Sequence, residues 1–141
     1  MSAPIVLGYD GSPSANAALA KTVEIASALD APVVVVFGFY ISPLGGGDVH
    51  DYKAELERVG AHAVARAVTD LEAEGIETTA RIVSAKPADA ILEVAEEVGA
   101  QLIAVGTVGE NPISGALLGS VVLRLVQRSK VPLLVVPAEE G

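Results

Sequence analysis

Residues Val33-Val34-Val35-Val36-Phe37 form an unbroken run of β-branched and aromatic side chains, directly after Ala31-Pro32. Consecutive apolar residues, rather than alternating ones, indicate a strand that is covered on both faces. A strand of this kind is typical of a sheet that lies between two layers of helices. The fold therefore depends on whether helices and strands alternate on either side of this run.

They do alternate. Further strands are expected at 4–9, 77–84, 101–105 and 131–136, and helices at 14–29, from 48 or 51 to 74, at 87–98 and at 120–129. Ser14 and Ser120 are candidate N-caps. The alternating pattern at 77–84 is typical of an edge strand. With no linker or repeat in view, the order predicts one domain over residues 1–141: a five-stranded, mainly parallel sheet with helices on both faces, doubly wound and Rossmann-like.

Composition excludes several classes of function. The 141-residue chain has a net charge of −9 and no cysteine, which disfavours nucleic acid and anionic membrane surfaces and excludes disulfide or thiolate chemistry. It has neither a signal-peptide pattern at its start nor an apolar stretch long enough to span a membrane, so a cytoplasmic location is expected. An anionic nucleotide would need local donors, and backbone amides can supply them.

The main functional signal follows the fourth predicted strand, where Gly106 and Gly109 are followed by Gly119-Ser120. Glycines let the backbone turn tightly and approach a ligand, and a helix start offers amides without intrahelical partners. This pattern predicts a phosphate cradle built from backbone. It is neither a Walker A loop nor a Gly-x-Gly-x-x-Gly fingerprint. A plain strand-to-helix connection with glycine caps is the alternative reading.

The loop after the first strand is the second candidate, because ligands of open α/β sheets bind at the carboxyl ends of strands. It contains Gly8 and Asp10. Asp10 can cap the turn with its own side chain, contact a nucleotide, or do both. His50 and His62 are expected to be surface residues, so no protein metal site is predicted. No activated nucleophile or general base is visible.

These motifs resemble the ATP-binding branch of the universal stress protein family. Gly106, Gly109, Gly119 and Ser120 match every fixed position of its Gly-x2-Gly-x9-Gly-Ser/Thr signature. The segments IVLGYDGSPSANAAL and LLGSVVLRLVQRSKVPLLVVP resemble the beginning and end of that domain. The resemblance extends over almost the whole chain and implies a fold of the adenine nucleotide alpha-hydrolase-like kind.

The resemblance also implies roles for single residues. Gly8 and Asp10 would lie beside the adenine or ribose, and a carbonyl near Gly38 would face the base. The loop after the fourth strand would pass close to the ribose and phosphates. The start of the last helix would offer amides and a hydroxyl to the β- and γ-phosphates. The residues implied are Gly106, Thr107, Val108, Gly109 and Glu110 in the loop, and Gly119, Ser120 and Val121 at the helix. Mg²⁺ or Mn²⁺ would be held mainly by phosphate oxygens and water.

Some positions depart from the family pattern. Val108 and Val122 stand where polar residues are common, Glu110 adds a carboxylate near the expected phosphates, and Pro112 removes an amide. These departures predict weaker ATP binding or a preference for ADP or AMP.

The leading hypothesis is a cytoplasmic, ATP-binding homodimer that acts as a nucleotide-dependent stress sensor, with at most slow hydrolysis. The last strand, residues 131–136, should be an edge that pairs with a second copy; a monomer with a loop over this edge is the alternative. Two other functions stay open: a weak ATPase or nucleotidyl transferase that uses Asp10 and a metal ion, and a protein-interaction module with an empty pocket.

Overall fold

The computed structural model describes residues 2–41, 49–108 and 118–139. Strands and helices alternate through these segments, as the sequence predicts. In chain order the elements are β1 (Ile5–Gly8), α1 (Pro13–Leu29), β2 (Val33–Phe39), α2 (Val49–Ala73), β3 (Thr78–Ser84), α3 (Pro87–Val98), β4 (Leu102–Gly106), α4 (Ser120–Arg128) and β5 (Leu133–Val136).

The strands form one sheet in the order β3-β2-β1-β4-β5, and all four pairings are parallel. This confirms the predicted doubly wound sheet, with β3 and β5 at its two edges. Ile5 in the central strand pairs with Val33 of β2 on one side and with Leu102 of β4 on the other. The run that begins at Val33 is buried over its first four residues, as its composition predicts.

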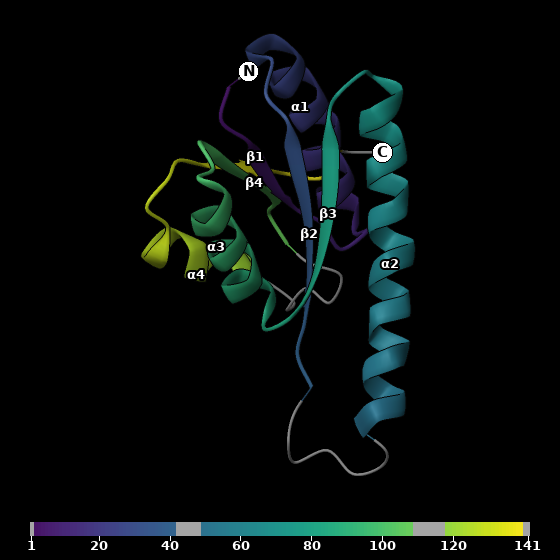
Figure 1. The fold of residues 1–141 in the computed structure, drawn as a ribbon. Helices are drawn as coiled ribbons and strands as arrows, with labels where there is room; N and C mark the ends of the chain where they lie inside the picture. Colours follow the sequence, from purple (N-terminus) through teal and green to yellow (C-terminus); the bar gives the residue numbers. More distant parts are fainter. Residues whose placement is uncertain (1, 42–48, 109–117, 140–141) are drawn as a thin grey trace.

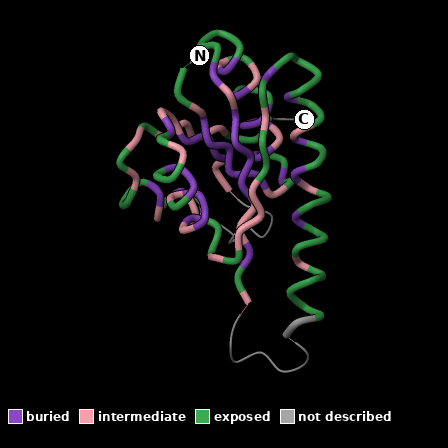
Figure 2. Tube along the Cα trace, in the orientation of Figure 1, coloured by how far each residue is buried: buried purple, intermediate pink, exposed green. Residues whose placement is uncertain are grey.

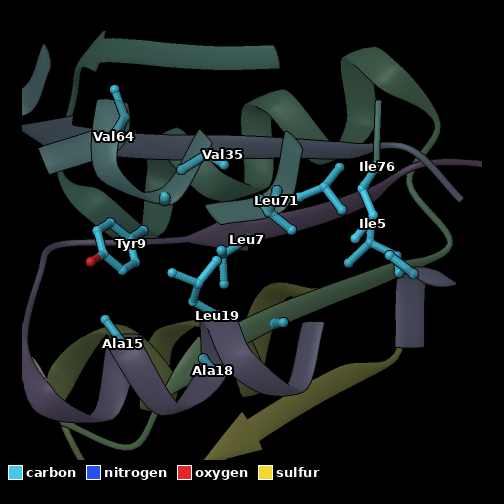
Figure 3. Close-up of a cluster of buried hydrophobic side chains, with 14 of the residues drawn as sticks. Ile5, Leu7, Tyr9, Ala15, Ala18, Leu19, Val35, Val64, Leu71 and Ile76 are labelled. Carbon is cyan, nitrogen blue, oxygen red and sulfur yellow. The ribbon is translucent and has the colours of Figure 1, made fainter. Parts of the chain in front are cut away.

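Helices cover both faces of the sheet. Helices α1 and α2 pack on one face, and α3 and α4 lie together on the other (Figure 1). Buried residues concentrate in the central strands and on the inward sides of the helices (Figure 2). In the core between the sheet and helices α1 and α2, Leu7 lies close to Leu19 of α1 (Figure 3), and Leu71 of α2 belongs to the same cluster.

The structure corrects two predicted helix caps. Ser12, not Ser14, is the N-cap of α1, because Pro13 occupies the first helical position, which proline favours. Gly119, not Ser120, is the N-cap of α4, and Ser120 is its first helical residue. Strand β2 continues to Phe39, and β5 begins only at Leu133, after Pro132. Among the described residues, no helix is both long and apolar enough to cross a membrane.

Candidate functional site

A pocket with about 540 Å³ of empty space, including its open mouth, lies at the carboxyl edge of the sheet between β1 and β4. Helix α1 follows β1 onto one face of the sheet, whereas α4 follows β4 onto the other, so the winding direction reverses here. The pocket thus occupies the topological switch point, where open α/β sheets bind their ligands.

The pocket has a mainly apolar wall and a polar rim. Its lining comprises Gly8, Tyr9, Asp10, Ser12, Ala15, Val36, Phe37, Gly38, Pro87, Ile91, Val105, Gly106, Thr107, Val108, Gly119, Val121 and Val122. None of these residues is a lysine or an arginine. Any anion bound by this part of the chain must therefore rely on hydroxyls and backbone amides.

Three glycines of the pocket lie against neighbouring elements, and at Gly106 and Gly38 the neighbour includes backbone that leaves no room for a side chain. A Cβ on Gly106 would lie 2.5 Å from the carbonyl carbon of Ser14 and 2.7 Å from the amide nitrogen of Ala15. A Cβ on Gly38 would lie 2.8 Å from Cα of Pro87, and one on Gly8 would overlap Ile91. These glycines admit α1 and α3 against the strand ends, which is a structural reason for them that the motif alone did not reveal.

The loop after β1 satisfies its own polar groups. Asp10 Oδ1 accepts a hydrogen bond of 3.0 Å from the Ser12 amide, which confirms the expected turn-capping role. Gly11 has a φ of 82°, a left-handed conformation that glycine adopts without strain. Ser12 Oγ then accepts a bond of 3.3 Å from the amide of Ala15. The start of α1 is consequently closed by groups of the protein itself.

The short segment after β4 is held from three sides. The Thr107 amide donates to the carbonyl of Val136 in β5 at 3.0 Å, and the Thr107 carbonyl accepts from the Gly119 amide at 2.7 Å. Ser14 Oγ donates to the carbonyl of Val108 at 2.5 Å and accepts from its amide at 3.3 Å. The segment therefore joins β5, α1 and the start of α4.

The start of α4 differs from the expected cradle in one respect. The amide of Gly119 is engaged by Thr107, so it does not point at a ligand. Gly119 also provides no side-chain cap. The amides of Ser120, Val121 and Val122 occupy the first turn and have no intrahelical acceptor. These three amides, with the positive end of the helix dipole, are groups that can hold an anion at this end of the pocket.

Most of the residues singled out from the sequence come together here. Those that line the pocket are Gly8, Asp10, Gly38, Gly106, Thr107, Val108, Gly119 and Val121. Ser120 begins α4 beside them, whereas Gly109 and Glu110 lie outside the described residues. Sequence reasoning missed Ser14 as a contact of the loop and Ile91 as a wall residue. No local pattern marks either one, because both contacts join distant parts of the chain.

Tyr9 closes the pocket on the α1 side. Its hydroxyl donates to Oδ1 of Asn16 at 2.5 Å, and the ring lies beside Ala15 (Figure 3). Burial raises the pKa of Tyr9 above its ordinary value of 10.0, Arg66 opposes this effect, and Asp70 and Asp10 add to it. Tyr9 is therefore a neutral wall residue at physiological pH. Within the described ranges, no cluster of three or more His, Asp or Glu side chains could hold a metal ion.

Comparison with known proteins places this chain in a family. A family model described as "Universal stress protein family" matches residues 1–137. The chain belongs to the universal stress protein family. It is similar to Universal stress protein MJ0531 of Methanocaldococcus jannaschii, with 31% identity over 136 residues that cover 94% of this chain and 80% of the relative.

Solved structures of the family extend the comparison. One, described as a universal stress protein in complex with cAMP, has 31% identity and a TM-score of 0.71, and the match covers 97% of this chain and 98% of that one. Another, from Archaeoglobus fulgidus in complex with dAMP, has 26% identity and a TM-score of 0.69, over 96% and 98% of the two chains. Relatives of the same fold thus bind adenine nucleotides.

Proposed function

We propose that this protein binds an adenine nucleotide in the pocket between β1 and β4. The observation that carries the proposal is the uncapped start of α4 at one end of an otherwise apolar pocket. An apolar wall with one polar, anion-attracting end matches a ligand with a flat base and a phosphate. The cAMP and dAMP complexes of relatives support the same ligand class.

The base would occupy the apolar part of the pocket. Ile91, Val105 and Pro87 supply its walls, and the backbone near Gly38 offers polar groups to the base edge. The carbonyl of Val36 already accepts from the Tyr9 amide at 3.0 Å, so it is not the group that reads the base. The ladder with β3 uses the carbonyl of Phe37, because Phe37 pairs with Ile82 in the same alternation that joins the Val33 amide to Glu77. We therefore place the recognising carbonyl at Gly38.

The phosphates would lie at the start of α4. The amides of Ser120 to Val122 and the Ser120 hydroxyl are neutral donors, which suits a protein with a net charge of −9. Asp10 is the only carboxylate among the described lining residues. An accompanying Mg²⁺ or Mn²⁺ would therefore be held mainly by phosphate oxygens and water, rather than by a set of protein ligands.

ATP is the ligand that the signature of four fixed positions predicts, with ADP and AMP as the less charged alternatives. The test is titration of the purified protein with AMP, ADP and ATP, with and without Mg²⁺, together with analysis of the nucleotide released on denaturation. Saturable binding supports the proposal. Absence of both bound nucleotide and binding at millimolar concentrations contradicts it. Phosphate release that is lost in Asp10→Asn while ATP still binds would support the enzyme alternative instead.

We also propose that nucleotide binding serves a regulatory role in a homodimer formed through β5. The described bonds from Ile103 and Thr107 use the carbonyls of Pro132 and Val136. Because bonding alternates along a parallel strand, the backbone groups of Leu133 and Val135 face the open side of β5. An open edge of this kind can pair with a second copy.

Val135→Pro tests the dimer, because it removes an outward amide and leaves the β4 ladder intact. Light scattering after size exclusion should give a dimer for the parent protein and a monomer for the variant. A monomeric parent, or a variant that stays dimeric, would exclude pairing through this edge.

A further inference from the structure

Ser14 is a buried serine whose hydroxyl contacts a backbone far away in the sequence. Its side chain lies in the first turn of α1 and is 1% exposed. The hydroxyl donates to the carbonyl of Val108 at 2.5 Å and accepts from the amide of the same residue at 3.3 Å. One hydroxyl therefore fixes both polar groups of a single peptide residue.

The close approach of Ser14 requires space that Gly106 provides. Any Cβ at residue 106 would overlap Ser14 Oγ and lie 2.5 Å from the carbonyl carbon of Ser14. Ser12 Oγ is 3.5 Å from the same Val108 carbonyl, which makes it a marginal second donor. The contact therefore depends mainly on Ser14.

Thr107 connects the Ser14 contact to the start of α4. Val108 follows Thr107, whose carbonyl accepts the amide of Gly119 at 2.7 Å. Gly119 is the N-cap of α4 and has no side-chain cap of its own. The position of the first turn of α4 is consequently set by the backbone that Ser14 holds.

We propose that Ser14 is a positioning residue that aligns the start of α4 for the phosphate of the bound nucleotide. This inference rests on the proposed nucleotide site. Ser14 would act through Val108, Thr107 and Gly119. Because these residues orient the anion-binding amides, loss of the hydroxyl should weaken the grip on phosphate and leave the apolar base pocket intact.

The experiment compares adenosine with AMP as probes. In Ser14→Ala, we expect the affinity for AMP to fall by about tenfold, an effect of the size of one or two hydrogen bonds. The affinity for adenosine should stay within about twofold of the parent, because adenosine lacks the phosphate. In NMR spectra, the amide resonance of Val108 should shift and the amide of Gly119 should exchange faster with solvent.

Thr22→Val is the matched control. Thr22 is a buried residue of the same helix, 1% exposed, and its hydroxyl donates to the carbonyl of Ala18 at 2.7 Å. This variant removes a buried hydroxyl of α1 without contact to the loop. It should bind adenosine and AMP like the parent protein and leave the Val108 resonance in place.

The outcomes separate this inference from the proposed site. If the parent binds neither adenosine nor AMP, the proposed function fails. If the parent binds both and Ser14→Ala keeps its AMP affinity, or loses adenosine and AMP equally, the positioning role is wrong. Should Ser14→Ala not fold, Ser14→Cys is measured in its place, since a thiol is a weak donor and acceptor. Ser14→Cys should then lose affinity for AMP selectively, by less than is expected for Ser14→Ala. An AMP affinity of Ser14→Cys equal to that of the parent would overturn the role.

Discussion

Two helices begin at the carboxyl edge beside the same pocket, and their first turns differ. At α1, Asp10 accepts the Ser12 amide, Pro13 has no amide, and Ser12 Oγ accepts the amide of Ala15. At α4, Gly119 supplies no side-chain acceptor, and the following three amides have none within the helix. Among the described residues, the start of α1 therefore has side-chain acceptors for its amides, whereas the N-cap of α4 supplies none.

This difference separates stability from binding. A capped helix start contributes to the free energy of folding, whereas an uncapped one retains the capacity to bind an anion. Substitutions in the first turn of α1 should therefore lower the free energy of unfolding. Substitutions in the first turn of α4 should instead lower the affinity of the protein for nucleotide.

The largest expected effect comes from making α4 begin as α1 does. Gly119 has φ −75° and ψ 164°, an extended conformation that any residue adopts. Gly119→Asp places a carboxylate at the N-cap, where it accepts amides of the first turn of α4 and repels phosphate. AMP affinity should fall by more than about tenfold, the equivalent of ~1.4 kcal/mol, in calorimetric titration. The stability should change by only a few tenths of a kcal/mol.

Two matched variants separate the possible causes. Gly119→Ser adds a neutral cap and should lower the affinity by a few-fold, whereas Gly119→Ala adds a methyl group without an acceptor and should bind almost normally. If Gly119→Ala loses as much affinity as Gly119→Asp, the effect is steric, and the amides are not the binding groups.

A smaller effect, on stability, is expected at the other helix. Ser12→Ala removes the N-cap of α1 and should lower the free energy of unfolding by about 1 kcal/mol in urea denaturation. Ser27→Ala makes the same change at an exposed position of α1 and should stay within about 0.5 kcal/mol of the parent. Equal stability of the two variants would show that the Ser12 cap does not stabilise α1.

The smallest effect concerns Tyr9 at alkaline pH. The folded protein raises the pKa of Tyr9, so the folded state holds this proton more tightly than the unfolded state. The stabilisation is fully present below the unfolded pKa and is lost as pH rises through the higher folded pKa. Denaturation between pH 9 and 12 should therefore show a decline that is shallower in Tyr9→Phe. An identical slope in the variant would refute the Tyr9 contribution.

Much of the fold could be predicted from local sequence. The run from Val33 predicts a buried strand, and Gly75 and Gly99 mark helix ends where the structure has φ values of 77° and 65°. The caps were placed wrongly at Ser14 and Ser120, although Ser12-Pro13 is a pattern that indicates an N-cap followed by the first helical residue.

The candidate site was less accessible to sequence reasoning. The expected strand ends and the family resemblance placed Gly8, Gly38 and Gly106 at one site, yet they could not reveal that α1 and α3 pack against these glycines. The bond between Ser14 and Val108 spans 94 residues and leaves no local pattern. The engagement of the Gly119 amide by Thr107 likewise follows from tertiary structure alone.

The central claim is that the start of α4, and not that of α1, receives the phosphate. The direct measurement is an NMR titration of the ¹⁵N-labelled protein with AMP, followed at the backbone amides. We expect the resonances of Ser120, Val121 and Val122 to shift strongly and saturably, and those of Ala15 and Asn16 to move little. Shifts confined to the first turn of α1, or none at α4, would contradict the claim.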